Sequence, residues 1–186
     1  LTRGRVREHN GGKVGGFNAN VMINNSTNVV VESLQIVGRG LAPNNGPTEI
    51  GVLIINGRSV AINRNNISSV NLGVFVRGAN ATGNRIFENV IVGGAIPANN
   101  LLGICYNPAE GAGDGGPRGD NIYNNLITRF GYAVAVSSGS ISNIFNENNL
   151  ASFIGNFREP EAFVEGGGTN ISDGNLEVLI PATTLP

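Results

Sequence analysis

Internal repetition is the feature that most constrains the fold of this chain. A short pattern recurs in which an asparagine comes directly before an aliphatic residue, and Ser33-Leu34 stands in the same place earlier in the chain. Successive asparagines of the pattern are 23, 36, 24 and 26 residues apart. A period of this length predicts a stack of similar units, each burying its apolar face against its neighbours. The five copies are Asn66-Ile67, Asn89-Val90, Asn125-Leu126, Asn149-Leu150 and Asn175-Leu176.

An alternating, strand-like run precedes each copy of this pattern. In the run GVFVR at residues 73–77, Val74 and Val76 share a face because neighbouring side chains of a strand point to opposite sides. Stacked in a parallel sheet, such pairs form a continuous core. We therefore expect a solenoid of about six coils. The corresponding inward pairs of the other runs are Val21/Ile23, Val52/Ile54, Ile104/Tyr106 and Val134/Val136.

The recurring asparagine is expected at the bend between two strands of one coil. Its amide satisfies backbone groups of a turn, and the residue tolerates left-handed backbone geometry. Because neighbouring coils are about 4.8 Å apart, stacked amides also bond to one another. We expect the residue after each asparagine to point into the core, and Gly51, Gly73 and Gly103 to lie at bends where a Cβ would be crowded. The predicted asparagine ladder consists of Asn66, Asn89, Asn125, Asn149 and Asn175.

The composition agrees with short strands and turns, and it argues against several partners. Only 13% of the 186 residues are charged, and 28 are glycine. The net charge of −1 leaves no basic footprint for a nucleic acid, and no apolar run is long enough to span a membrane. Cys105 is the only cysteine, so no intrachain disulfide is possible, and we expect neither a metal nor a cofactor. The absence of an initiator methionine indicates a processed or truncated start.

The period, the asparagine pattern and the strands that begin with glycine resemble the right-handed parallel β-helix proteins of the pectate-lyase-like superfamily, with their short β-helix repeats. The resemblance covers roughly residues 17–180. It implies one all-β domain over residues 1–186, with an N-terminal segment (1–16), the coils (17–180) and a tail (181–186). The spacing of leucine-rich repeats is absent, and a β-sandwich would not place asparagine at one phase five times. This fold hosts lyases, hydrolases, epimerases, adhesins and phage tail spikes, so the resemblance does not fix the activity.

An apolar column is expected on the outside of the solenoid. It needs a cover or a partner, and the candidates are the chain's own loops or tail, a second copy, or a ligand. Three insertions, at residues 38–49, 93–101 and 107–120, interrupt the repeat and are candidate functional loops. The predicted outward column reads Met22, Leu53, Phe75, Cys105, Ala135 and Phe163.

The acid–base chemistry available to the chain is sparse. Hydrolysis of a glycosidic bond requires paired carboxylates, but none of the three aspartates has such a partner on a neighbouring strand. Lyases of the superfamily use arginine or lysine as base, which implies Arg77 and Arg118 as candidate catalytic residues, with Tyr106 reaching residues 107–120. The alternative for the two arginines is surface solvation, or an ion pair with an aspartate of that loop. The expected ligand-binding residues are Phe75, Asn107, Asp114 and Asp120.

Two functions follow from these observations. The first is a binding or structural module of a secreted or surface protein, which engages polysaccharide or associates with itself. The second is a lyase or epimerase that acts on a uronate-containing glycan through Arg77, Arg118 and residues 107–120.

Overall fold

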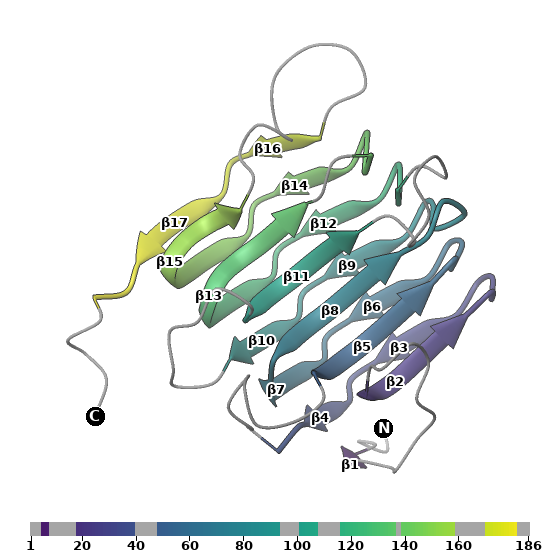
Figure 1. The fold of residues 1–186 in the computed structure, drawn as a ribbon, viewed down its shortest axis with the longest axis horizontal. Coiled ribbons are helices and arrows are strands. Elements are labelled where there is room, and N and C mark those ends of the chain that lie inside the picture. Colours follow the sequence, from purple (N-terminus) through teal and green to yellow (C-terminus); the bar gives the residue numbers. More distant parts are fainter. Residues whose placement is uncertain are drawn as a thin grey trace.

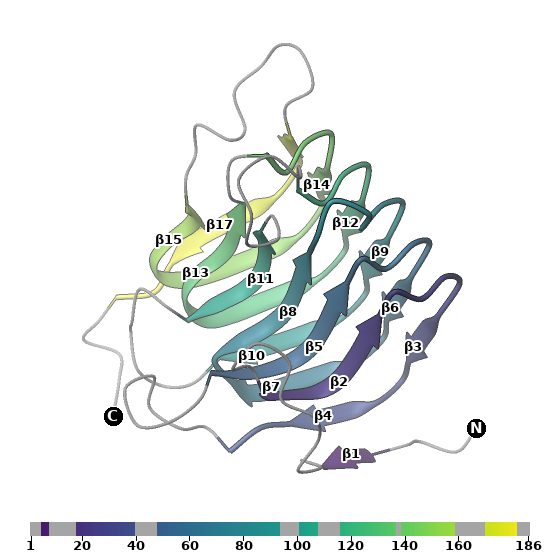
Figure 2. The same cartoon turned by 45° about the vertical axis from the view of Figure 1, so that its right-hand side comes forward.

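The computed structural model describes residues 5–7, 18–39, 48–93, 101–107, 116–136, 139–158 and 170–181. Within these ranges all regular structure is β, and every pair of neighbouring strands is parallel. The strands are stacked in sheets that curve toward one another, an arrangement that fits the predicted solenoid (Figures 1 and 2).

The described strands fall into three rows. The first row contains β2 (Asn18–Asn24), β5 (Glu49–Ile55), β8 (Leu72–Arg77) and β11 (Leu102–Asn107). The second row is a six-stranded sheet of β3 (Val30–Glu32), β6 (Ala61–Asn63), β9 (Arg85–Phe87), β12 (Asn121–Tyr123), β14 (Ile144–Asn146) and β16 (Ile171–Asp173). The third row contains β1 (Arg5–Arg7), β4 (Gln35–Val37), β7 (Asn66–Val70), β10 (Val90–Gly93) and β17 (Leu176–Leu179). Two long strands, β13 (Leu126–Val136) and β15 (Asn149–Arg158), run from the third row into the first and join these rows into an 11-stranded sheet.

Equivalent residues of successive strands lie side by side and build the core in columns. In the first row, Val52 pairs in register with Val74, and Val74 with Ile104. All three are fully buried. So are Ile54, Val76 and Tyr106, the second members of the same predicted inward pairs. The column of the third row is Ile36, Ile67, Ile91, Ile127 and Leu150, and that of the second row is Val31, Ile62, Ile86, Ile122 and Phe145.

A hydrogen-bonded row of asparagine side chains lies at the bend between the second and third strand rows. In each step the Nδ2 of one asparagine donates to the Oδ1 of the next, over 2.9–3.0 Å. The backbone N–H of the first asparagine donates to the same oxygen. Every bend thus binds the next one through two hydrogen bonds. The row consists of Asn65, Asn89, Asn125, Asn148 and Asn175.

Two residues of the predicted row are corrected by the structure. Asn66 and Asn149 are exposed, and the residues just before them, Asn65 and Asn148, take the inward positions. The residue after each asparagine was also expected to point into the core. This is confirmed for Ile67 and Leu150, which are buried, but Leu126 is 41% exposed and Ile127, one position later, is buried. The left-handed residue precedes the inward asparagine, as at Glu88 and Asn124, so the strand alternation begins one residue earlier than predicted.

The outward apolar column of the first strand row is present in the predicted register as far as Ala135. The next residue in register is Arg158, and the predicted Phe163 lies outside the described residues. Leu53 is fully buried and Phe75 is 4% exposed, and both belong to a second apolar cluster. These side chains are withdrawn from water within the single chain, so neither a ligand nor a second copy is needed to cover them.

Candidate functional site

A polar strip runs along the turns that join the first strand row to the second. One residue of each turn forms a parallel bridge with its equivalent in the next turn. Side chains of this strip therefore follow one another at about the strand spacing of 4.8 Å. The bridged residues are Thr27, Arg58, Thr82, Arg118 and Ile141.

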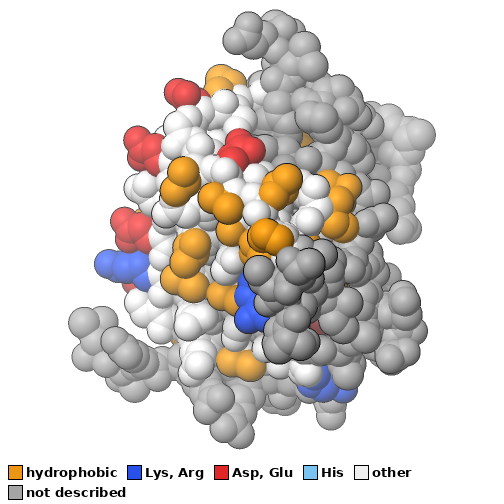
Figure 3. All heavy atoms as spheres, turned by 90° about the vertical axis from the view of Figure 1, so that its left-hand side faces the viewer, with side chains coloured by type: hydrophobic (Ala, Val, Ile, Leu, Met, Phe, Trp, Pro, Cys, Tyr) orange, Lys and Arg blue, Asp and Glu red, His pale blue; other side chains and the backbone are white. Residues whose placement is uncertain are grey.

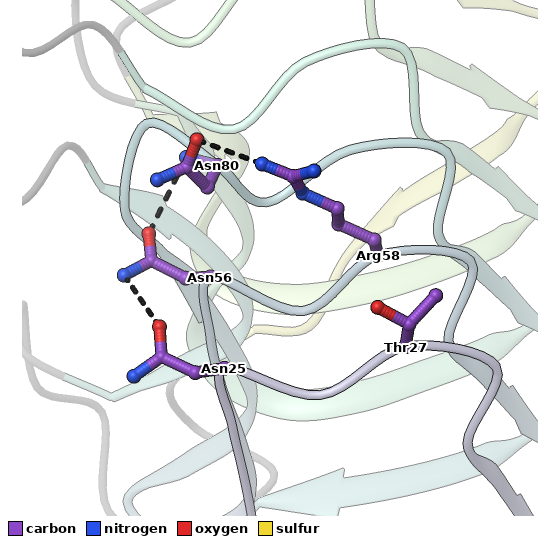
Figure 4. Close-up of a pocket in the computed structure, with 5 residues that line it drawn as sticks. All are labelled: Asn25, Thr27, Asn56, Arg58 and Asn80. Atoms are coloured by element: carbon purple, nitrogen blue, oxygen red, sulfur yellow. Dashed lines mark hydrogen bonds between the residues drawn. The ribbon is translucent and has the colours of Figure 1, made fainter.

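An open pocket of about 240 Å³ lies in the part of the strip formed by the first turns (Figure 4). Its lining residues are Asn25, Thr27, Asn56, Arg58 and Asn80. The pocket is therefore built from amide, hydroxyl and guanidinium groups only. Such groups both donate and accept hydrogen bonds, which suits a polar ligand rich in hydroxyl groups.

Hydrogen bonds between the lining residues fix the amides of the pocket. Asn56 Nδ2 donates to Asn25 Oδ1 over 3.2 Å, and the backbone N–H of Asn80 donates to Asn56 Oδ1 over 3.3 Å. A Cβ on Gly78 would lie 2.2 Å from Asn56 Oδ1, and Gly78 has a φ of 97°. Only glycine therefore allows the Asn56 amide to occupy this place.

Among the residues that the structure describes, none gives the Arg58 guanidinium an acidic partner. Its Nη2 donates to Asn80 Oδ1 over 3.1 Å, and the side chain is exposed. An arginine carries five N–H donors, so most of them remain for water or a ligand. Figure 4 shows this guanidinium beside the Asn80 amide, with Thr27 on the adjacent, preceding turn. The pocket thus combines a positive charge with prearranged amides.

Arg118 lies two bridges from Arg58 in the same strip. Its Nη2 donates to the carbonyl oxygen of Ala79 over 3.0 Å, and the side chain is exposed. The alternative ion pair with Asp120 is not formed. Asp114, the other aspartate considered for that pair and a predicted binding residue, lies outside the described residues.

Tyr106 and Asp120 are joined in the interior. The Tyr106 hydroxyl donates to Asp120 Oδ2 over 3.1 Å, so it does reach residues 107–120 as expected. Tyr106 is fully buried and Asp120 is 1% exposed. Neither side chain is accessible to a ligand on the surface, which separates them from the strip.

The remaining predicted site residues lie at the end of the first strand row. The Arg77 guanidinium lies 5.8 Å from the centre of the Phe75 ring, and Phe75 itself is buried. Asn107 is exposed and pairs in register with Arg77. Arg118 Nη2 donates to the carbonyl oxygen of Ala79, two residues after Arg77, so the two candidate catalytic arginines make different contacts.

The residues that line the pocket were not predicted from the sequence. A usable signal was present, because an asparagine stands two positions before three successive bridged residues. These pairs are Asn25 and Thr27, Asn56 and Arg58, and Asn80 and Thr82.

The described part of the chain contains no group of three His, Cys, Asp or Glu side chains placed to hold a metal ion. It also contains no helix with the length and apolar character needed to cross a membrane.

Comparison with protein-family models gives no match to this chain, and comparison with curated proteins gives none either.

Proposed function

We propose that the chain is a right-handed parallel β-helix of about six coils with an asparagine ladder, and that it binds an acidic polysaccharide along the polar strip. The observation that carries this proposal is the Arg58 guanidinium, which lies in a pocket of fixed amides and has no acidic partner among the described residues. We place such a module outside the cell or on its surface.

The spacing of the strip supports a polymeric ligand. Arg58 and Arg118 are separated by two strand spacings, or about 10 Å, with Thr82 between them. This is about the length of two sugar rings joined end to end. A guanidinium binds a carboxylate through charge-assisted hydrogen bonds, and the intervening amides and hydroxyl suit sugar hydroxyl groups. A chain with one carboxylate for every two rings would meet both arginines.

Binding without turnover is favoured over a lyase or epimerase reaction. An arginine is protonated under ordinary conditions and becomes a base only in a strongly cationic site. The Arg77 guanidinium lies over the Phe75 ring, Arg118 donates to the Ala79 carbonyl, and the Tyr106 hydroxyl donates to Asp120. The enzyme alternative, which uses Arg77, Arg118 and residues 107–120, therefore lacks an assembled acid and base among the described residues.

Self-association is a second candidate function, and a different observation favours it. Hydrophobic side chains gather on the face that holds β10, β13, β15 and β17 (Figure 3). Leu176 is 63% exposed, Leu179 59% and Val178 50%, all on β17. Contiguous apolar surface of this kind is typical of interfaces.

Calorimetric titration with galacturonate oligomers and with uncharged glucose oligomers tests the proposal. We expect binding of the charged oligomers, weakened roughly 10-fold by Arg58→Ala and again by Arg118→Ala. Arg129→Asn is the matched control, because Arg129 is exposed, lies outside the strip and has a φ of 63° that asparagine tolerates. Binding that is unaffected by either strip variant would contradict the site. New ultraviolet absorbance from an unsaturated product would instead support the lyase.

A further inference from the structure

A second hydrogen-bonded row lies inside the molecule, at the start of the strands of the second row. The backbone N–H at each position donates to the side-chain oxygen of its equivalent in the next coil, over 2.8–3.1 Å. A residue with positive φ precedes most of these positions, as at Gly119 and Ser142. The row is therefore a repetition of the asparagine geometry found at the other bend. Its members are Val60, Asn84, Asp120, Asn143 and Asn170.

Asp120 is the single carboxyl group in this row of amides. Its Oδ1 accepts the Asn84 backbone N–H over 2.8 Å, and its Oδ2 accepts Asn84 Nδ2 over 3.0 Å and the Tyr106 hydroxyl over 3.1 Å. Tyr106 is the titratable side chain in contact with it. Two charged residues lie close to this contact in the sequence: Arg85, which follows Asn84, and Arg118, two residues before Asp120. Both are exposed; the Arg85 guanidinium lies over the Phe87 ring, and Arg118 donates to the Ala79 carbonyl.

An ionised Asp120 has no side-chain donor for the next position of the row. Asn84 Nδ2 donates to Asp120 Oδ2 over 3.0 Å, and Asn143 Nδ2 donates to Asn170 Oδ1 over 2.8 Å. The corresponding atom of Asp120 is an oxygen, and among the described residues Asn143 Oδ1 accepts the Asp120 backbone N–H without a side-chain donor from that coil. A protonated Asp120 would supply this donor, as Asn84 and Asn143 do in their own steps.

We propose that Asp120 is a proton switch within the fold. With a proton taken from solvent, its carboxyl group donates to Asn143 Oδ1 and the side-chain row is continuous from Asn84 to Asn170. Without that proton, the row is interrupted between Asp120 and Asn143, and Asn84 and Tyr106 hold the carboxylate. This inference is independent of the proposed ligand.

The electrostatics of the site agree with this switch. Burial raises the pKa of Asp120 from its ordinary value of 3.8 to about 6, although hydrogen bonds from Asn84 and Tyr106 oppose the change. Burial and the Asp120 charge raise the pKa of Tyr106 well above its ordinary value, so its hydroxyl remains a donor. The folded chain therefore binds a proton more tightly than the unfolded chain. The stability from Asp120 is complete below about pH 4 and is lost as the pH rises through about 6.

The segment most affected is residues 116–120, which carries Arg118. Gly116 N–H donates to the Gly139 carbonyl over 2.7 Å, and Arg118 N–H donates to the Ala81 carbonyl over 3.0 Å. Asp120 ends this segment and joins it to both neighbouring coils. Its side chain accepts from Asn84 in the preceding coil, and its backbone N–H donates to Asn143 in the following coil. Ionisation of Asp120 thus weakens the attachment of the segment to the coil that follows.

Denaturant unfolding of Asp120→Asn and of the unchanged chain between pH 4 and pH 8 tests the switch. An amide at this position donates to Asn143 Oδ1 and to the Tyr106 oxygen, and its own oxygen accepts both Asn84 donors, as in the other row. The difference between a pKa of about 6 and 3.8 corresponds to roughly a 100-fold change in the unfolding equilibrium constant. We expect the variant to gain up to this factor over the unchanged chain as the pH rises from 4 to 8.

Two further variants separate the switch from a general effect of charge. Asp173→Asn removes an exposed carboxylate by the same substitution, and it should leave the pH dependence unchanged. Tyr106→Phe removes one donor to the carboxylate, so it should destabilise the chain more at pH 8 than at pH 4. A constant gap between Asp120→Asn and the unchanged chain at every pH would overturn the proposal. An Asp120 carboxyl resonance that titrates near its ordinary value would overturn it independently of stability.

Discussion

At the scale of single residues, the bends depend on a left-handed residue followed by an inward amide. Arg64, Glu88 and Asn124 all have φ values of 54–55° and all stand directly before a buried asparagine. Each of these asparagines then bonds both to backbone carbonyls and to its equivalent in the next coil. The amide is part of the interior, and its neighbour in the sequence is part of the surface.

Adjacent asparagines allow this distinction to be tested with one substitution at two positions. Asn148→Ala removes a buried amide and leaves the N–H groups of Asn125 without their acceptor. Buried unsatisfied donors cost about 1–3 kcal/mol each, so we expect a loss of roughly 2–4 kcal/mol of unfolding free energy. Asn149→Ala, one residue later on the exposed side, should change it by less than about 0.5 kcal/mol. Equal effects in urea unfolding would contradict the assignment of the inward residue.

The same pair shows what the sequence can specify at this scale. A single asparagine, as at Asn89, identifies its own position in the bend. Where two asparagines are adjacent, as in Asn65-Asn66 and Asn148-Asn149, either one could be the inward residue of the bend, and the residue types do not distinguish the two choices. Only the backbone conformation of the preceding residue decides between them, and an arginine or glutamate in left-handed geometry has no sequence signature.

At the scale of strands, glycines permit the coils of the first row to approach one another. A Cβ on Gly73 would lie 2.4 Å from the carbonyl oxygen of Gly103 and 2.4 Å from Cγ2 of Ile91. Gly51 and Gly103 meet equivalent contacts. The expectation that these glycines lie where a side chain would be crowded is therefore confirmed.

Substitution of Gly73 should separate adjacent strands. Gly73→Ala forces a methyl group against backbone that is bonded on both sides, so we expect a loss of about 1–3 kcal/mol, typical of overpacked interiors. Gly73→Val should prevent a stable fold. Thermal unfolding followed by circular dichroism measures both, and an unchanged midpoint for the alanine variant would show that the strands have room to part.

Strand positions and inward pairs could be predicted, because side chains alternate along a strand and only two assignments of the inward face are possible. The continuous strands β13 and β15 could not be predicted, since two separate strands were expected in each of these places. In β13 the chain turns from the third row to the first without an insertion, through Arg129 at a φ of 63°. The pocket could not be predicted either. Its residues come from three turns that are far apart in the sequence, and only the register between successive coils brings them together.

At the scale of the whole molecule, the apolar columns end in the last described coil. Ser172 follows Phe145 in the second row, and Glu177 follows Leu150 in the third. Both are exposed. Polar side chains at positions that are apolar in earlier coils oppose further stacking at this edge.

Restoring the apolar columns should therefore promote association at this edge. The double variant Ser172→Val and Glu177→Leu extends the second-row and third-row columns by one coil. We expect a larger mean mass by light scattering, rising with protein concentration, than for the unchanged chain. Ser68→Val adds a similar apolar group away from the edge and serves as the control. A mass identical to that of the unchanged chain would show that the polar residues do not guard this edge.

The direction of the strand pairing also determines how the molecule would respond to tension. The hydrogen bonds between coils lie along the stacking axis (Figure 1). A force that draws the first and last coils apart therefore breaks the bonds between one pair of neighbouring coils at a time. Such a structure peels open from its ends, and each coil of 23 to 36 residues would release roughly 80 to 120 Å of chain. The stack would therefore lengthen by one coil at a time under load, as an extensible tether does, while its remaining coils stay folded.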